Sequence, residues 1–258
     1  MKKLSVLLLV VTFIFVFVAC DITGLPEQTP KDNQEDDNNI NSQIKPRKGG
    51  TLSLAVQGID TWNPLLAKTS DAVNFLGLIY EGVVGYDKDL SKIPVLASDW
   101  NVSDDGRLWT FNIRKDAVWH NGEELTAEDV IFTFNILKSG ILDSFYEHNI
   151  YENDNILEIG LKSNDKYSFF IRLAEPSSKL LDLMTFPVLS KEYFETAENM
   201  LNNQYDLTST PIGTGPYKAQ DDFLIDEKVV RLVRNEVWWG VDPYIDKIEG
   251  KIYSNRKE

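Results

Sequence analysis

The chain has a single cysteine, Cys20, among its 258 residues, and only two histidines, His120 and His148. One cysteine excludes a disulfide framework within the chain and a metal site built from several thiolates. Basic residues are also scarce, because 26 Lys and Arg stand against 40 Asp and Glu, for a formal net charge of -14. Binding to phosphates needs a basic surface, so this balance argues against nucleic acid as a partner.

Motifs of catalysis and of phosphate binding are missing as well. The chain has no GxSxG and no HExxH, and neither histidine stands near an activated serine. The stretch PIGTGPYK (211–218) lacks the GxxxxGK[ST] spacing of a phosphate loop, so Gly213 and Gly215 are predicted to allow tight turns and close backbone packing. We therefore predict no enzymatic activity, no cofactor and no metal site. His120 is predicted to have a structural role, and His148 to lie in a polar loop without a partner.

The first long apolar segment stands at the N-terminus. Lys2 and Lys3 precede an apolar stretch of 16 residues, 4–19, which is short for a spanning helix but suits a secretory signal. The residues Phe17-Val18-Ala19-Cys20 resemble a bacterial lipobox, although the Phe and Val depart from its usual Leu and Ala or Ser. That resemblance implies removal of residues 1–19 and attachment of diacylglycerol to Cys20. An uncleaved anchor and an incidental cysteine in an ordinary signal are the alternatives, and all three export the rest of the chain.

A polar linker follows the apolar segment. Residues 21–48 are rich in Asn, Asp, Gln, Glu and Pro and contain no aromatic residue. Such a composition cannot bury enough apolar surface to offset the entropy of ordering, so the linker is predicted to be disordered. A flexible chain of 28 residues has a root-mean-square span of roughly 30 Å. The predicted organisation is thus a signal (1–19), a lipidated Cys20 with an acidic linker (20–48), and a folded part (49–258).

Strand and helix patterns alternate in the folded part. Ser70 is predicted to cap a helix over 71–84, with Val73, Leu76, Tyr80 and Val84 on its buried face. Asp105-Gly106 predicts a hairpin turn between strands, and Asn121-Gly122 a second turn. Thr126 and Asp129 form a capping box for a helix that runs to Lys138 with Val130, Phe134 and Leu137 buried. Further strands are predicted at 51–56, 99–102, 108–114, 156–161, 166–173, from 217, at 228–234 and at 247–253, and a short helix at 176–184. The predicted class is mixed α/β without an internal repeat.

Several segments, in order, resemble one family. They are GGTLSLAV with DTWNPL, LIYEGVVGYDKDL, IPVLASDWNVSDDGRLWTFNIRKDAVWHNGEELTAEDVIFTFNIL, PIGTGPYK, and VRNEVWWG with YIDKIEGKIY. The chain resembles the extracellular solute-binding proteins of family 5, the oligopeptide and dipeptide receptors of ABC importers, over residues 49–253. The resemblance implies a type II periplasmic-binding-protein clamshell, a peptide ligand, ABC permease partners, and hinge closure favoured by the ligand.

The resemblance also implies a ligand-contacting loop. In the family, the loop after the first core strand gives main-chain contacts to the ligand, so Asp60, Thr61, Trp62 and Asn63 are expected to line the cleft. A packed turn at Asn63-Pro64 is the alternative. The pair Trp238-Trp239 could stack on a ligand, although a role in wedging its loop against the core is favoured.

Family members are longer than this chain. The chain is therefore expected to hold the first lobe and the adjoining smaller subdomain, and to bind peptide weakly or not at all by itself. Three other functions stay open. In the first, the same fold binds an oligosaccharide, nickel or haem. In the second, the chain is a remnant surface lipoprotein that binds another protein, and in the third it is an enzyme.

Overall fold

The computed structural model describes residues 46–142, 144–163, 165–196, 210–225 and 228–253. All of them belong to one compact unit, residues 45–258. The apolar N-terminal segment, Cys20 and nearly all of the predicted linker lie outside the described residues. In the part of the chain that the structure describes, helices are too short or too polar to cross a membrane.

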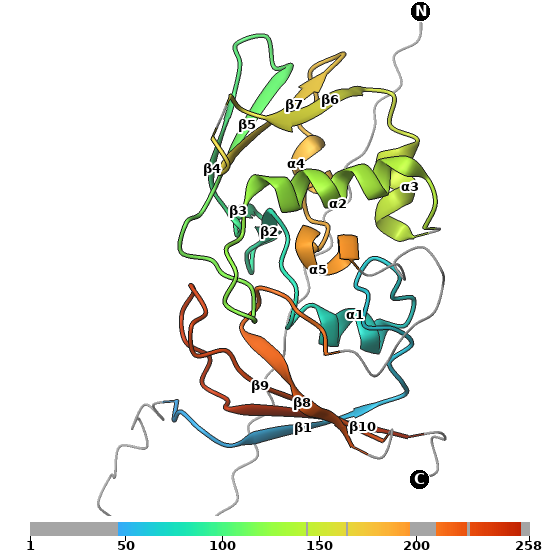
Figure 1. Ribbon diagram of the computed structural model, residues 1–258, viewed down its shortest axis with the longest axis vertical. Helices are drawn as coiled ribbons and strands as arrows, with labels where there is room; N and C mark the ends of the chain where they lie inside the picture. Colours follow the sequence, from blue (N-terminus) through green and yellow to red (C-terminus); the bar gives the residue numbers. More distant parts are fainter. Residues whose placement is uncertain (1–45, 143, 164, 197–209, 226–227, 254–258) are drawn as a thin grey trace, which may run out of the picture. The chain divides into compact units, whose positions relative to one another are not determined.

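A four-stranded sheet forms one end of the unit (Figure 1). It contains β1 (Thr51–Val56), β8 (Tyr217–Ile225), β9 (Val229–Arg234) and β10 (Lys247–Ile252), in the order β1-β10-β9-β8. β1 pairs with β10 in parallel, and the other pairs are antiparallel. We call it the terminal sheet. Helix α1 (Ser70–Leu76) covers one of its faces, because the ring of Phe75 lies directly over Gly250, where a Cβ atom would come within 2.5 Å.

A second four-stranded sheet has the order β4-β5-β7-β6 and is antiparallel throughout. Its strands are β4 (Ala97–Val102), β5 (Leu108–Ile113), β6 (Ile156–Leu161) and β7 (Ser168–Leu173). The predicted hairpin is confirmed, with Gly106 at a positive φ of 70° in its turn. Alternation along β5 buries Phe111, whose ring stacks on Phe169 with centroids 5.0 Å apart. Cross-strand aromatic pairs of this kind stabilise a sheet beyond the area that they bury.

Helix α2 (Ala127–Ser139) begins with the predicted capping box of Thr126 and Asp129. The backbone N–H of Thr126 donates to the Asp129 carboxylate at 2.8 Å, and the other oxygen of that carboxylate accepts from Lys191 N at 2.8 Å. The helix ends at Gly140, which has a left-handed φ of 72°. Its predicted core residues are all buried: Val130, Phe134 and Leu137.

Smaller elements complete the described fold. They are β2 (Val84–Tyr86), β3 (Lys92–Pro94), α3 (Phe145–Tyr151), α4 (Leu180–Leu183) and α5 (Lys191–Thr196). The helix predicted over 176–184 is thus reduced to one turn. The loop predicted around His148 is wrong, because this residue lies in α3, with Nε2 at 3.6 Å from the Glu152 carboxylate.

The first helix is also shorter than predicted. Thr69, not Ser70, caps it by accepting from Ala72 N at 3.2 Å, and the helix ends before Gly77. After that point the backbone is held by a distant segment, since Ile79 O accepts from Gly215 N at 2.8 Å. Tyr80 is therefore buried, as expected, but outside the helix, whereas the side chain of Val73 is 45% exposed.

Candidate functional site

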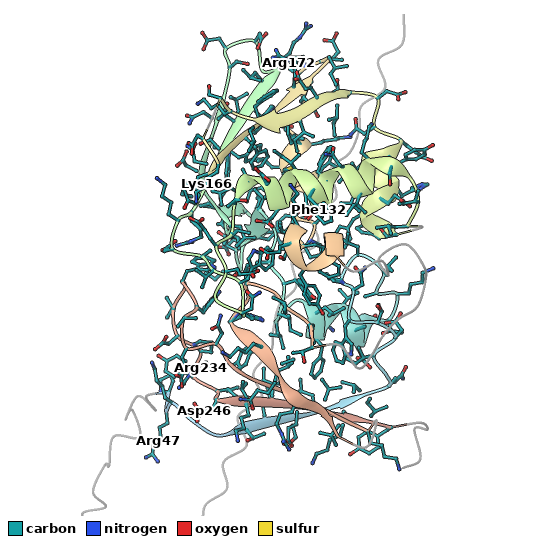
Figure 2. The ribbon with its side chains drawn as sticks, viewed as in Figure 1. Arg47, Phe132, Lys166, Arg172, Arg234 and Asp246 are labelled. Carbon is teal, nitrogen blue, oxygen red and sulfur yellow. The ribbon has the colours of Figure 1, made fainter. Side chains whose placement is uncertain are left out.

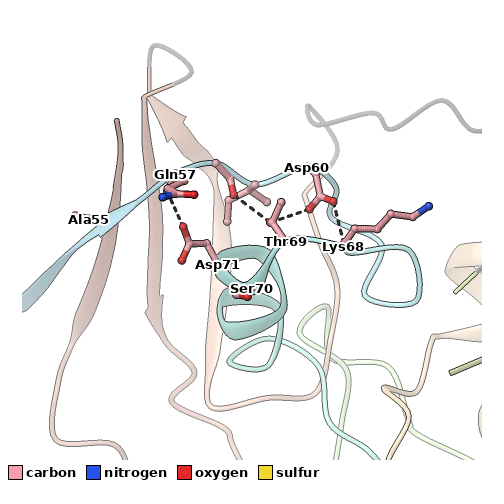
Figure 3. A pocket seen from close by; sticks show the side chains of 9 residues that line it. Ala55, Gln57, Asp60, Lys68, Thr69, Ser70 and Asp71 are labelled. Carbon is pink, nitrogen blue, oxygen red and sulfur yellow. Dashed lines mark hydrogen bonds between the residues drawn. The ribbon is translucent and has the colours of Figure 1, made fainter. Parts of the chain in front are cut away.

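The loop after β1 is held by side chains of its own neighbourhood. Asp71 of α1 accepts from Gln57 N at 2.6 Å, directly after the strand ends. The carboxylate of Asp60 accepts from Lys68 N at 2.9 Å and from Thr69 Oγ1 at 3.2 Å (Figure 3). These bonds close the loop onto the start of α1, so Asp60 and Asp71 both fix backbone and are not isolated charges.

Three of the four predicted ligand residues form a turn. Thr61 Oγ1 accepts from Asn63 N at 3.0 Å, and Asn63 Oδ1 accepts from Leu65 N at 3.0 Å. Thr61 and Trp62 are buried, with 1% and 6% of their surface exposed, so Trp62 is not the exposed tryptophan that a sugar ligand would need. The packed turn is therefore present. That this loop contacts a ligand through its main chain stays a prediction.

Two hollows flank the loop. The first, which we call the strand-end pocket, has a volume of about 770 Å³ and includes Asp60 (Figure 3). Its lining residues come from the end of β1 and the start of α1: Ala55, Gln57, Gly58, Ile59, Asp60, Lys68, Thr69, Ser70 and Asp71. The two carboxylates of this pocket, Asp60 and Asp71, already accept hydrogen bonds from backbone N–H groups. The pocket is therefore better suited to polar contacts than to binding a strongly charged group.

The second hollow, which we call the tyrosine pocket, has a volume of about 160 Å³. It is lined by residues of the loop, α1, α3 and the segment after α4: Pro64, Val73, Leu76, Gly77, Tyr80, Gly82, Tyr146, Thr185 and Pro187. No lining residue is charged, and burial raises the pKa of both Tyr80 and Tyr146 above the usual value, so both phenols are neutral. An apolar cavity of about 150 Å³ is large enough for a benzene ring, so this pocket can take one apolar or aromatic side chain.

Sequence patterns did not reveal the tyrosine pocket. Its walls come from segments more than 120 residues apart, Pro64 at one extreme and Pro187 at the other. The nearest local signal was the aromatic pair Phe145-Tyr146, whose rings meet edge to face with centroids 5.6 Å apart. Phe145 is 79% exposed beside the pocket-lining Tyr146, which makes this end of α3 an apolar surface.

His120 joins two distant segments and has the structural role predicted for it. Its backbone N–H donates to Gly213 O at 2.8 Å, and its Nδ1 accepts from Gly213 N at 3.3 Å. The proton is therefore on Nε2, which donates to Gly215 O at 3.1 Å. Burial lowers the pKa of His120 to about 4, so the imidazole is neutral near pH 7. The predicted close packing at Gly213 is confirmed, because a Cβ atom there would lie 2.0 Å from Ile79 O.

The carboxylate of Glu81 holds both indole rings of the pair Trp238-Trp239 in place. Its carboxylate accepts from Trp238 Nε1 at 3.2 Å and from Trp239 Nε1 at 3.0 Å. The Arg114 guanidinium lies 3.4 Å from the ring centre of Trp239. Burial raises the pKa of Glu81, while the indole N–H groups oppose that rise. Both indole N–H groups are thus occupied inside the protein, which favours the wedging role over stacking on a ligand.

A metal site is not evident in the described residues, because they contain no group of three His, Cys, Asp or Glu side chains close enough to hold an ion. His120 is engaged on both ring nitrogens, and His148 Nε2 lies 3.6 Å from the Glu152 carboxylate.

Comparisons with known proteins all lead to bacterial solute-binding proteins. The family model described as "Bacterial extracellular solute-binding proteins, family 5 Middle" matches residues 92–257. The nickel-binding periplasmic protein of Escherichia coli is 33% identical over 175 residues, which cover 66% of this chain and 31% of that protein. The dipeptide-binding protein of Escherichia coli is 33% identical over 173 residues, 60% of this chain and 31% of that protein.

Among solved structures, the periplasmic binding protein DppA from Helicobacter pylori in complex with the peptide STSA matches with a TM-score of 0.69 and 25% identity. The match covers 82% of this chain and 44% of that one. The predicted mixed α/β fold of the periplasmic-binding-protein type is thereby confirmed. The chain spans about a third of the length of the curated relatives that it matches.

Proposed function

Because the chain belongs to the family 5 bacterial extracellular solute-binding proteins, we propose that it acts as the substrate-binding component of an ABC importer and that its solute is a peptide. The observation that carries this proposal is the match to a peptide-bound periplasmic binding protein over 82% of the chain. The 33% identity to a dipeptide-binding protein supports the same solute class.

The two hollows suggest how a peptide would lie. Its main chain would run along the loop of residues 58–63, whose backbone is held in place by the side chains of Asp60, Thr61 and Asn63. One apolar side chain would enter the tyrosine pocket, whose lining includes the neutral phenol of Tyr146. Main-chain recognition suits peptides of varied sequence, because every peptide presents the same amide groups.

Nickel is the second candidate solute, because the nickel-binding relative from Escherichia coli is 33% identical. The described residues contain no cluster of metal ligands. This part of the chain could therefore bind a nickel complex only through the organic ligand of the metal, not by coordinating the metal itself. Peptide is therefore the preferred proposal. Oligosaccharide and haem have less support, since the described tryptophans near the loop and Glu81 are buried or internally bonded.

Anchoring belongs to the same proposal. Cys20 would carry diacylglycerol after removal of residues 1–19, and the body would stay on the extracytoplasmic face near its permease. Two acyl chains hold a protein firmly, at about 0.8 kcal/mol per buried methylene, whereas one chain is marginal. Mass spectrometry of the mature N-terminus in the native host tests this, and an unmodified Cys20 thiol would contradict it.

The solute is tested by nuclear magnetic resonance of the labelled chain, which detects binding even at millimolar affinity. We expect tripeptides with a central Leu or Phe to shift the signals of residues 58–63 and of Tyr146, and Ni²⁺ or cello-oligosaccharides to leave them unchanged. Shifts produced by Ni²⁺ or by cello-oligosaccharides, with none produced by peptides, would reject the peptide proposal.

Two valines of similar exposure provide a matched pair of variants. Val73 lines the tyrosine pocket and is 45% exposed, whereas Val102 of β4 lies outside both hollows and is 42% exposed. Val73→Asp places a charge in an apolar pocket and should weaken binding of the Leu and Phe peptides by roughly tenfold or more. Val102→Asp should not change it.

A further inference from the structure

Helix α3 forms one wall of the tyrosine pocket, because Tyr146 is among the residues that line it. This helix has only 7 residues, and an isolated helix of that length is not stable in water. Its position therefore depends on the elements around it. The contacts of α3 with α2 are more extensive than those with any other described helix or strand, and Figure 1 shows α3 lying across the end of α2.

Helix α2 provides a firm base for this contact. Val130, Phe134 and Leu137 are buried in the core, and Phe132, which is labelled in Figure 2, packs against the core from the same helix. The helix begins at its capping box and ends at the left-handed Gly140. A side chain that reaches from the last turn of α2 to α3 can therefore fix α3 relative to the core.

Lys138 is such a side chain. Its Nζ lies 2.9 Å from Asn153 O, at the end of α3. The same Nζ lies 3.3 Å from Ile150 O and 3.4 Å from Tyr151 O. Carbonyl groups in the last turn of a helix lack partners within the helix and carry partial negative charge. The three N–H donors of the lysine ammonium group thus meet three acceptors that converge on it.

Two further contacts fix α3 closely. A Cβ atom on Gly140 would lie 2.5 Å from the ring of Tyr151, so this ring packs directly over the end of α2. Near the start of α3, the buried carboxylate of Glu147 accepts from Leu142 N at 2.5 Å. Because Tyr146 lies between these two contacts, the place of its ring in the pocket wall depends on how α3 is held.

We propose that Lys138 is a positioning residue for the tyrosine pocket: by holding the C-terminal end of α3 it places Tyr146, and it thereby determines which peptide side chain the pocket accepts. The effect on peptides rests on the proposed function, whereas the effect on Tyr146 does not. The pocket has a volume of about 160 Å³, close to the space that one aromatic ring needs. A small displacement of one wall therefore changes the fit. Lys138 does not line the pocket and acts through α3.

Fluorine nuclear magnetic resonance of the full chain labelled with fluorotyrosine tests the first step without any ligand. Tyr146→Phe identifies the signal of Tyr146. Lys138→Met keeps an unbranched side chain but removes the charge and the N–H donors, so the Tyr146 signal should move toward that of free fluorotyrosine or broaden. Thr126→Ala is the matched control, because it removes the capping box at the opposite end of the same helix and should leave that signal in place. All variants are compared well below their unfolding temperatures.

Peptide preference tests the second step in the same variants. In the wild-type chain, a tripeptide with a central Phe should bind more tightly than one with a central Gly. Lys138→Met should reduce the ratio of the two dissociation constants by roughly threefold or more, and Thr126→Ala should not change it.

Three results would overturn the role of Lys138. They are an unchanged Tyr146 signal in Lys138→Met, an unchanged ratio of dissociation constants in that variant, and an equal change of either quantity in Thr126→Ala. If the wild-type chain binds neither tripeptide measurably, the fluorine signal decides the role of Lys138 by itself. Failure of the peptide proposal is thus distinguished from failure of this one.

Discussion

Protonation of His120 should destabilise the fold in mildly acidic solution. The imidazole accepts a hydrogen bond at Nδ1 from Gly213 N and donates one from Nε2 to Gly215 O, so its neutral form is fully used. A proton added to Nδ1 would replace that acceptor by a donor facing another donor. Burial already holds the pKa of His120 at about 4, below the ordinary value of 6.5 for histidine.

The sign and size follow from proton linkage. Since the folded-state pKa is depressed, the folded protein binds fewer protons than the unfolded chain, and stability from this group is complete only above about pH 6.5. It decreases as the pH falls from 6.5 toward 4, the range between the two pKa values. A difference of about 2.5 units corresponds to a total loss of about 3 kcal/mol, most of which is reached by about pH 4.5.

Urea denaturation of the full chain at about pH 7.5 and about pH 4.5 measures the effect. His120→Gln removes the titrating group. Between these two pH values, the free energy of unfolding of the variant should fall by about 2–3 kcal/mol less than that of the wild-type chain. For a folded part of this size, the same difference is roughly 5–10 °C in Tm. His148→Gln is the control, because His148 is exposed at the surface, beside Glu152.

Two results would refute the reasoning. One is an equal loss of stability on acidification for the wild-type chain and for His120→Gln. The other is a directly measured pKa of His120 near that of a free histidine, by nuclear magnetic resonance. The buried carboxyls do not affect the comparison, because Glu81 and Asp129 are present in both chains and their raised pKa values favour the folded state at low pH.

Four further substitutions test the fold. Gly213→Ala puts a Cβ atom 2.0 Å from a backbone oxygen and should cost more than about 3 kcal/mol in unfolding free energy, whereas Gly122→Ala, at a φ of 88° with nothing within 4 Å, should cost about 1 kcal/mol. Thr126→Ala removes the capping box of α2 and should lower thermal stability by about 1 kcal/mol. Glu81→Gln turns an amide N–H group toward an indole N–H and should cost about 1–3 kcal/mol, with a red shift in the emission of Trp239 as the loop loosens.

Structure that depends on neighbouring residues could be predicted from the sequence. The hairpin at Gly106 follows from a residue able to take positive φ between alternating strands. The start of α2 follows from Thr126 and Asp129, which are three positions apart and satisfy each other's backbone. In both places all the determining atoms lie within one turn of chain, so a local pattern contains the necessary information.

Features fixed by distant segments could not be predicted in this way. The apolar spacing from Val73 to Val84 favoured one long helix, but the chain leaves helical geometry because Leu78 and Ile79 offer their carbonyls to residues 215–217. The role of Glu81 depends on two tryptophans 157 and 158 positions away. A periodic pattern predicted the burial of Tyr80 correctly and that of Val73 wrongly, and it did not show which element buries Tyr80.

The predicted ligand loop depends both on neighbouring residues and on more distant segments of the chain. Asp60, Thr61 and Asn63 were selected through a family resemblance, and that they line a ligand cleft stays a prediction. Their side chains bond to groups within nine residues of themselves. Because these side chains hold the loop, its shape and its amide groups are the features expected to contribute most to recognition. Selectivity would then depend on what the neighbouring tyrosine pocket accepts. Because that pocket is uncharged and close to the size of one aromatic ring, the physical expectation is a receptor that tolerates many peptide sequences but prefers an apolar side chain at one position.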